Sequence, residues 1–209
     1  MYNDHFFVYL FMLSTFSSRF QKFLPYVLQH EGGYVNHIND PGGETYRGIS
    51  RKAHPASELW KLVDQYKRNI PNIYTSEGVA RLNEVLNKDA RVQQMIMDIY
   101  HKNYWLAVKA DQMPYPVGEY VFDFAVNAGV VRAILILQKV LDVKVDGLLG
   151  PVTLDAARKK PVTSIMQEYY IERINYYVSI TIRNTNRFNV FFLGWIRRTN
   201  DMYKLLMNK

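Results

Sequence analysis

The chain has no cysteine among its 209 residues. This excludes disulfide bonds, zinc sites with cysteine ligands and catalytic thiols. Long hydrophobic stretches are also scarce: the apolar run at residues 6–13 (FFVYLFML) is far shorter than the roughly 20 residues that span a bilayer. No positive charge precedes this run and no typical cleavage site follows it, so a structural helix or an amphipathic lid is favoured over an export signal. We therefore treat residues 1–17 as an N-terminal extension and expect no stable membrane insertion.

Acidic residues are fewer than basic ones, which gives a net charge of +7 and a pI near 9.4. A basic surface suits a polyanion such as nucleic acid, anionic lipid or the bacterial wall. Lys and Arg are spread along the chain, and there is no zinc-finger spacing or RNA-binding signature, so we do not expect nucleic acid binding. The histidines show no His-Glu metal pattern, and we expect neither a metal nor another cofactor.

Strand patterns of any length are missing, and helical periodicity dominates. Apolar residues recur at helical spacing over 16–28, and further helical patterns cover about 75–100, 121–141, 151–160, 161–177 and 189–206. Residues 34–50 are expected to form a loop with at most a short β-hairpin through 34–35 and 48–49. The stretch 112–118 (QMPYPVG) is the best internal boundary, since prolines and glycine interrupt helices. The fold class is therefore predicted to be mainly α, with regions 18–111 and 112–209 packed as one continuous fold.

The stretch 30–50 (HEGGYVNHINDPGGETYRGIS) concentrates turn residues and acids. Glu31 stands where a helix is expected to end at Gly32-Gly33. Glycoside hydrolysis needs a protonated acid and a second group on the other face of the sugar, and a glutamate shielded by aromatic neighbours can supply the proton. Asp40 precedes a tight turn that can return it towards Glu31, and Thr45 offers a hydroxyl that can orient a water.

Each part of this pattern also has a purely structural interpretation. A glutamate before Gly-Gly is usually a solvated helix end, Asp-Pro-Gly-Gly is an ordinary turn, and threonine often bonds to the backbone within a turn. Glu44 is a rival second carboxylate, although a solvated loop position is favoured for it. The order and spacing of the whole set are more specific than any single residue.

The combined motifs resemble glycoside hydrolase family 108, which comprises phage and bacterial N-acetylmuramidases, some of them known as secretion activator proteins. The resemblance covers about residues 18–200. It is carried by Glu31-Gly32-Gly33-Tyr34, Asp40-Pro41-Gly42-Gly43, Thr45, Gly48-Ile49, Tyr104-Trp105, the run from Phe122-Asp123 to Asn127-Ala128-Gly129, Gln138, Asp146-Gly147, Gly150-Pro151, Thr153, Gly194-Trp195 and Arg198. Arg47 departs from the pattern, because the family tends to have a neutral residue before the glycine.

The resemblance implies a lysozyme-like helical fold with a Gly-rich active-site loop. Region 18–111 would be the muramidase catalytic region, and region 112–209 would be a helical, peptidoglycan-binding-like region. Glu31 would be the general acid, Asp40 would activate water or stabilise the cation, and Thr45 would orient the water. Tyr34, Tyr104 and Trp105 would stack on sugar rings and Asn127 would contact the substrate, although Tyr104 and Trp105 can equally be core residues and Asn127 a helix cap.

The segment from Asp146 to Thr153 resembles a peptidoglycan-binding segment, but its turn and helix-start residues favour a structural role. The implied function is hydrolysis of the β-1,4 bond between N-acetylmuramic acid and N-acetylglucosamine in peptidoglycan. The alternative is a non-catalytic peptidoglycan-binding or secretion-assisting protein. We expect a bacterial monomer that acts on the cell wall, in the periplasm or cell envelope.

Overall fold

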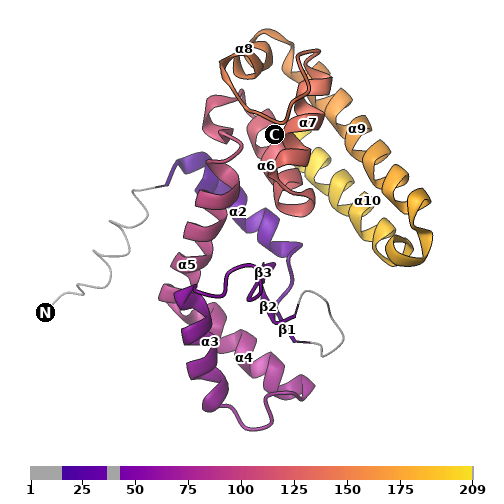
Figure 1. Ribbon diagram of the computed structural model, residues 1–209. Coiled ribbons are helices and arrows are strands. Elements are labelled where there is room, and N and C mark those ends of the chain that lie inside the picture. Colours follow the sequence, from indigo (N-terminus) through magenta and orange to yellow (C-terminus); the bar gives the residue numbers. More distant parts are fainter. Residues whose placement is uncertain (1–15, 37–42, 209) are drawn as a thin grey trace, which may run out of the picture. The chain divides into compact units, whose positions relative to one another are not determined.

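The computed structural model describes residues 16–36 and 43–208 (Figure 1). The chain divides into two compact units, one formed by Leu24–Tyr100 and the other by Met1–Phe23 together with His101–Lys209. The first helix described, α2 (Ser18–Gln29), crosses from one unit into the other, and the chain returns where α5 (Ala90–Tyr100) gives way to a π-helix (His101–Trp105). This division differs from the predicted regions 18–111 and 112–209.

The unit Leu24–Tyr100 combines helices with a small sheet. Its strands are β1 (Tyr34–Val35), β2 (Thr45–Tyr46) and β3 (Ile49–Ser50), and its helices after α2 are α3 (Glu58–Arg68), α4 (Ser76–Lys88) and α5. The strands are antiparallel in the order β1-β2-β3. The expected hairpin therefore has an additional central strand, because Thr45-Tyr46 pairs with both neighbours.

The helix α4 begins near residue 75, where the sequence predicts a helical pattern to start. Thr75 is the N-cap of α4, and its hydroxyl accepts a hydrogen bond from the Gly78 N–H at 3.1 Å. The helical pattern over 75–100 is divided at Asp89 into the two helices α4 and α5. Buried apolar side chains from the three helices form the core of the unit: Leu59, Val63, Leu82, Leu86, Val92 and Ile96.

The other unit is wholly helical within its described residues. After the π-helix and a 3-10 turn (Ala110–Gln112) come α6 (Val117–Ala128), α7 (Val130–Val140), α8 (Pro151–Lys159), α9 (Val162–Arg183) and α10 (Thr185–Met207). Pro151 is the first residue of α8, as predicted. Figure 1 shows α9 and α10 as a long antiparallel pair. The last helix begins at Thr185, earlier than the expected residue 189, because Asn184 caps it by accepting from the Arg187 N–H.

The centre of this unit holds a buried ion cluster on α6. Asp123 is fully buried and pairs with Arg173 of α9 at 2.7 Å and with Arg198 of α10 at 2.8 Å. The two arginines keep the pKa of Asp123 below its usual value, although burial acts in the opposite direction. A buried carboxylate is tolerated only when it is paired with cations. Because the two cations belong to α9 and α10, the cluster joins these helices to α6.

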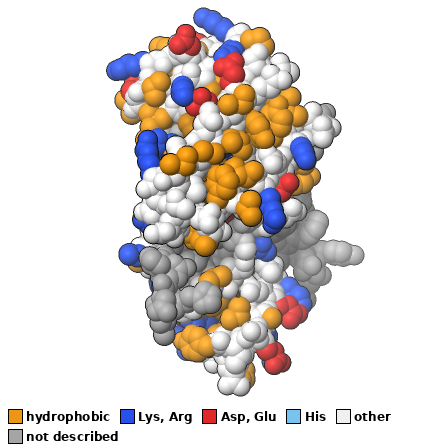
Figure 2. Space-filling model, turned by 90° about the vertical axis from the view of Figure 1, so that its right-hand side faces the viewer, with side chains coloured by type: hydrophobic (Ala, Val, Ile, Leu, Met, Phe, Trp, Pro, Cys, Tyr) orange, Lys and Arg blue, Asp and Glu red, His pale blue; other side chains and the backbone are white. Residues whose placement is uncertain are grey.

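Hydrophobic side chains also remain on the outside of this unit. Ile182, Val190, Phe191 and Leu193 of α9 and α10 are exposed. Figure 2 views the side that carries these helices and shows hydrophobic side chains gathered on it. No helix in the described ranges has the length and apolar character needed to cross a bilayer. The mainly-α prediction is confirmed.

Candidate active site

Glu31 is fixed by the end of α2. The helix passes through Pro25 and ends at Gln29, and the Glu31 N–H donates to the Leu28 carbonyl at 3.3 Å. Gly32 then adopts a left-handed conformation with φ +67°, which glycine accepts without strain. The predicted helix stop is therefore confirmed, and Glu31 lies half-buried directly after a rigid element.

The Glu31 carboxylate lies against the turn that joins β2 to β3. This turn consists of Arg47 (φ +49°) and Gly48 (φ +72°), and two positive φ angles in a two-residue loop are typical of a type I′ hairpin. A Cβ atom on Gly48 would overlap Oε2 of Glu31 and would lie 2.8 Å from the Tyr100 hydroxyl. The missing side chain is therefore what makes room for the acid.

Tyr100 is a site residue that the sequence did not reveal. It ends α5, is almost fully buried, and looks like one more apolar position in the helical pattern. Its hydroxyl donates to the Arg47 carbonyl at 2.7 Å and thereby holds the turn on which the Glu31 carboxylate rests. The acid, the turn and a phenol hydroxyl converge at one place.

Arg47, which departs from the family pattern, has a clear structural role. Its guanidinium donates to the Leu28 carbonyl at 3.2 Å and to Oδ1 of Asn87 at 2.9 Å. A cation is favourable at the C-terminal end of a helix, where carbonyl groups lack partners. Arg47 thus fastens the end of α2 to α4, next to Glu31.

Glu44 forms ion pairs within the unit. The prediction that its side chain is a solvated loop position was therefore wrong. Its carboxylate accepts from the Tyr34 hydroxyl at 2.6 Å and from Lys67 at 2.8 Å, and pairs with Arg51 at 2.6 Å. Tyr34 is buried, and this burial together with the bond to Glu44 raises its pKa to about 12. With its ring almost fully buried, Tyr34 anchors the loop.

Thr45 and Asp40 are the residues predicted to act on the water beside Glu31. Thr45 lies on β2, two residues before Arg47, and its hydroxyl donates to the Gly43 carbonyl at 3.2 Å. This is the bond within the turn that the structural interpretation expects. Asp40 lies outside the described residues.

Asn83 of α4 is a second residue that sequence reasoning missed. Its Oδ1 accepts from the Tyr34 N–H at 2.7 Å, and its Nδ2 donates to the Val79 carbonyl at 3.0 Å. These two bonds fix the start of β1, three residues after Glu31, to the surface of α4. A polar residue on a predicted helix carries no sign of such a contact.

The remaining predicted site residues belong to the other unit. Trp105 is fully buried, packs edge-on against Phe20 and Phe122, and donates from Nε1 to Asp111 at 2.6 Å. These are the contacts of a core residue. Tyr104 and Asn127 are half-buried, and Asn127 accepts a hydrogen bond from Tyr177 of α9.

The segment from Asp146 to Thr153 is organised by the buried Gln138. The side-chain oxygen Oε1 of Gln138 accepts from the N–H groups of Asp146 and Gly147 at 3.1 and 2.8 Å. Its amide nitrogen donates to Asp146 Oδ1 at 2.9 Å and to the Leu148 carbonyl at 3.1 Å. The segment is thus held by internal bonds, as its proposed structural role requires.

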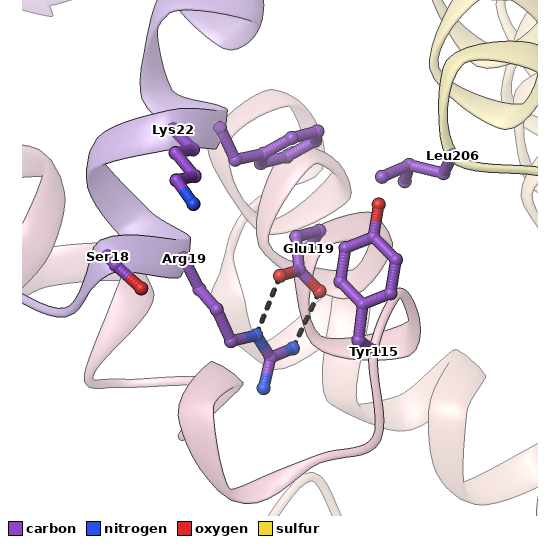
Figure 3. A pocket seen from close by; sticks show the side chains of 7 residues that line it. Ser18, Arg19, Lys22, Tyr115, Glu119 and Leu206 are labelled. Carbon is purple, nitrogen blue, oxygen red and sulfur yellow. Dashed lines mark hydrogen bonds and ion pairs between the residues drawn. The ribbon is translucent and has the colours of Figure 1, made fainter. Parts of the chain in front are cut away.

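A cavity of about 310 Å³ in the same unit lies beside Arg19 and Glu119 (Figure 3). Arg19 forms a two-pronged ion pair with Glu119, with distances of 2.8 and 2.6 Å, and this bond raises the pKa of Arg19. The two charges satisfy each other. Lys22 and the half-exposed ring of Tyr115 complete a basic, partly aromatic wall.

No group of three His, Asp or Glu side chains within the described ranges is arranged to hold a metal ion. The expectation that the protein needs no metal or other cofactor remains a prediction.

Comparison with known proteins identifies the family. The model of the Glycosyl hydrolase 108 family matches residues 24–129, which include Glu31, the Arg47–Gly48 turn and Tyr100. The chain belongs to glycosyl hydrolase family 108. A second model, described as "Predicted Peptidoglycan domain", matches residues 132–200 of this glycosyl hydrolase. The two matches meet at the junction of α6 and α7, whereas the sequence placed the boundary at 112–118.

A solved structure supports the same assignment. The family 108 chain is similar to the structure of Brucella abortus SagA, with 30% identity, a TM-score of 0.64, and coverage of 90% of this chain and 94% of that chain. A search of curated proteins found no match. The suspected resemblance is confirmed: the chain is a bacterial glycosyl hydrolase that acts on the peptidoglycan of the cell wall.

Proposed function

We propose that this family 108 hydrolase is an N-acetylmuramidase with Glu31 as its general acid. The bond cleaved is the β-1,4 linkage from N-acetylmuramic acid to N-acetylglucosamine. Glu31 protonates the glycosidic oxygen as the bond breaks, and a water molecule completes the hydrolysis. The observation that carries the proposal is the packing of the Glu31 carboxylate on Gly48, beside the Tyr100 hydroxyl.

Two features support this role for Glu31. A general acid must be held in a fixed position, because catalysis depends strongly on orientation. The end of α2, the type I′ turn and Tyr100 provide that support within one compact unit. By contrast, Glu44 is engaged by three donors, which disfavours it as a catalytic carboxylate.

We further propose that Asp40 activates the water or stabilises the cationic transition state, and that Thr45 orients the water. Asn127 and Tyr104 remain proposed substrate contacts. Tyr34 and Trp105 act instead through packing, since both rings are buried.

The test is digestion of purified peptidoglycan followed by mass spectrometry of the released fragments. The expected products carry new reducing ends at N-acetylmuramic acid. Glu31→Gln should lower the rate by about 10²–10⁴, the usual contribution of general acid catalysis. Glu84→Gln is the matched control, because Glu84 is an exposed glutamate of the same unit that pairs only with Lys88 in the described structure. Equal release by Glu31→Gln and wild type would refute the proposed acid.

The alternative is a non-catalytic peptidoglycan-binding or secretion-assisting protein. Retention on peptidoglycan without release of any fragment would support that alternative. For the hydrolase we expect a monomer that does not bind nucleic acid and acts in the periplasm or cell envelope. Light scattering and a gel-shift assay at low salt test the first two expectations.

A further inference from the structure

A cavity of about 390 Å³ lies between β1 and the N-terminal end of α4, within the unit that carries Glu31. Its lining residues share one property, which is that none of them is charged: Tyr34, Val35, Asn36, Tyr74, Ser76 and Val79. In a protein with net charge +7, such a neutral wall favours an uncharged ligand over an anionic one. Mostly apolar walls with a few polar groups are typical of small-ligand sites.

Tyr74 is the outstanding feature of this cavity. Its side chain is 76% exposed, more than any other aromatic side chain in the described ranges. Large rings are normally buried because they contribute much apolar area. An exposed ring on a cavity wall offers a flat apolar face with a polar hydroxyl at its edge.

The backbone under Tyr74 is held firmly. Thr75, the N-cap of α4, donates from both its N–H and its hydroxyl to the Asn72 carbonyl, at 2.9 and 2.8 Å. The same hydroxyl accepts from Gly78 in the first turn of the helix. The ring is therefore presented from a capped helix end, and a preorganised contact costs less entropy on binding.

A structural explanation for Tyr74 accounts for only part of its surface. A residue before the N-cap often packs against the fourth helical residue as a hydrophobic staple, and Val79 occupies that position here. A staple buries the ring against the helix. With three quarters of the side chain exposed, most of the Tyr74 ring remains available.

Polar groups on the same wall suit an N-acetylated sugar. Asn36 can donate and accept through its amide, and Ser76 through its hydroxyl. An N-acetylhexosamine has an apolar ring face, hydroxyl groups and a neutral acetamido group. The peptide stem of peptidoglycan, with its charged termini and side chains, matches this wall less well.

Two connections join the cavity to the segment that carries the proposed acid. Val35 and Asn36 follow Glu31 by four and five residues. On α4, Asn83 fixes the start of β1, and Val79 lies one helical turn before it, about 6 Å along the axis. A glycan strand that passes Glu31 can therefore continue onto this wall.

We propose that this cavity is a subsite for an uncharged N-acetylated sugar ring of the glycan strand, with Tyr74 as its stacking platform. The proposal rests on the proposed function, because the ring belongs to the strand that Glu31 cleaves.

The decisive experiment measures binding of an N-acetylglucosamine tetramer by calorimetry in the Glu31→Gln background, where turnover is suppressed. Tyr74→Ala should raise the Kd of the tetramer about tenfold, because the loss of one aromatic stacking contact has an effect of this size. Tyr74→Phe keeps the ring and should stay within about twofold, since only the hydroxyl is lost. Tyr115→Ala removes another exposed tyrosine, outside this cavity, and should leave binding unchanged.

A kinetic measurement accompanies the binding assay. With Glu31 intact, Tyr74→Ala should raise KM on glycan strands and leave kcat nearly unchanged, because stacking on a remote ring acts equally on ground and transition states. Tetramer binding by Tyr74→Ala equal to that of its background would overturn the subsite. Equal losses in the Ala and Phe variants would also overturn stacking as its basis. Failure of the proposed acid appears separately, as unchanged hydrolysis by Glu31→Gln.

Discussion

Gly48→Ala is the substitution that tests the architecture around Glu31 most directly. The variant adds a single methyl group at φ +72°, in the gap between the Glu31 carboxylate and the Tyr100 hydroxyl. Two costs follow, one for the backbone and one for the acid. The two costs can be separated, because an alanine substitution at another glycine of the same unit has only the backbone cost.

The backbone cost is about 1–2 kcal/mol, the penalty for an L-residue in the left-handed region. In a chain of this size it lowers Tm by about 2–8 °C. The second cost arises because the new Cβ overlaps Glu31 Oε2, so the carboxylate must move by about 1 Å to regain ordinary contact distance. A displacement of that size can lower the rate about 100-fold.

Gly32→Ala is the matched control. Gly32 has nearly the same φ, +67°, and lies next to Glu31, but a Cβ atom there meets nothing within 4 Å. We expect both variants to lose similar stability in thermal unfolding, and only Gly48→Ala to lose about 100-fold in peptidoglycan hydrolysis per folded molecule. Equal activity of the two variants would show that the overlap with Glu31 does not affect the rate of hydrolysis.

Two further predictions concern charged groups away from this turn. Asp123→Asn should lower the stability by about 3–5 kcal/mol, because it leaves two buried arginines without an anion. Since folding lowers the pKa of Asp123, its stabilisation is complete above the unfolded pKa near 3.9 and is lost as the pH falls further towards the folded pKa. Wild-type Tm should thus decrease below about pH 4, and a flat Tm between pH 5 and pH 2.5 would contradict this linkage. Glu44→Gln should lower the free energy of unfolding in urea by about 1–3 kcal/mol, because the bonds to its three partners are weakened. The rate of hydrolysis per folded molecule should stay within about tenfold of wild type. A near-complete loss of activity would instead make Glu44 the second catalytic carboxylate.

The sequence predicted the local features that depend on neighbouring residues. Helical spacing and turn residues identified the end of α2 before Gly32, a helical pattern from about residue 75 and the start of α8 at Pro151, because these signals act within one turn of helix. The order of Glu31 and the following turn residues was enough to indicate the family. These inferences needed no knowledge of how distant segments meet.

Most features that sequence reasoning missed depend on contacts between distant segments. Tyr100 reads as a core residue of α5, and only the fold brings its hydroxyl to the Arg47 carbonyl, 53 residues away in sequence. Glu44 reads as a loop residue until α3 brings Lys67 beside it. The extra strand β2 escaped notice because two residues are too few to show an alternating pattern.

The type I′ turn under Glu31 also affects how the enzyme should lose activity. The two-residue strands on either side of it contribute few hydrogen bonds, and such segments open locally at a lower free energy than whole units. When the hairpin opens, Gly48 and the Arg47 carbonyl leave the acid and Tyr100 while every helix can stay folded. Heat or denaturant should therefore abolish hydrolysis before helical circular dichroism changes, with early amide exchange at residues 45–50.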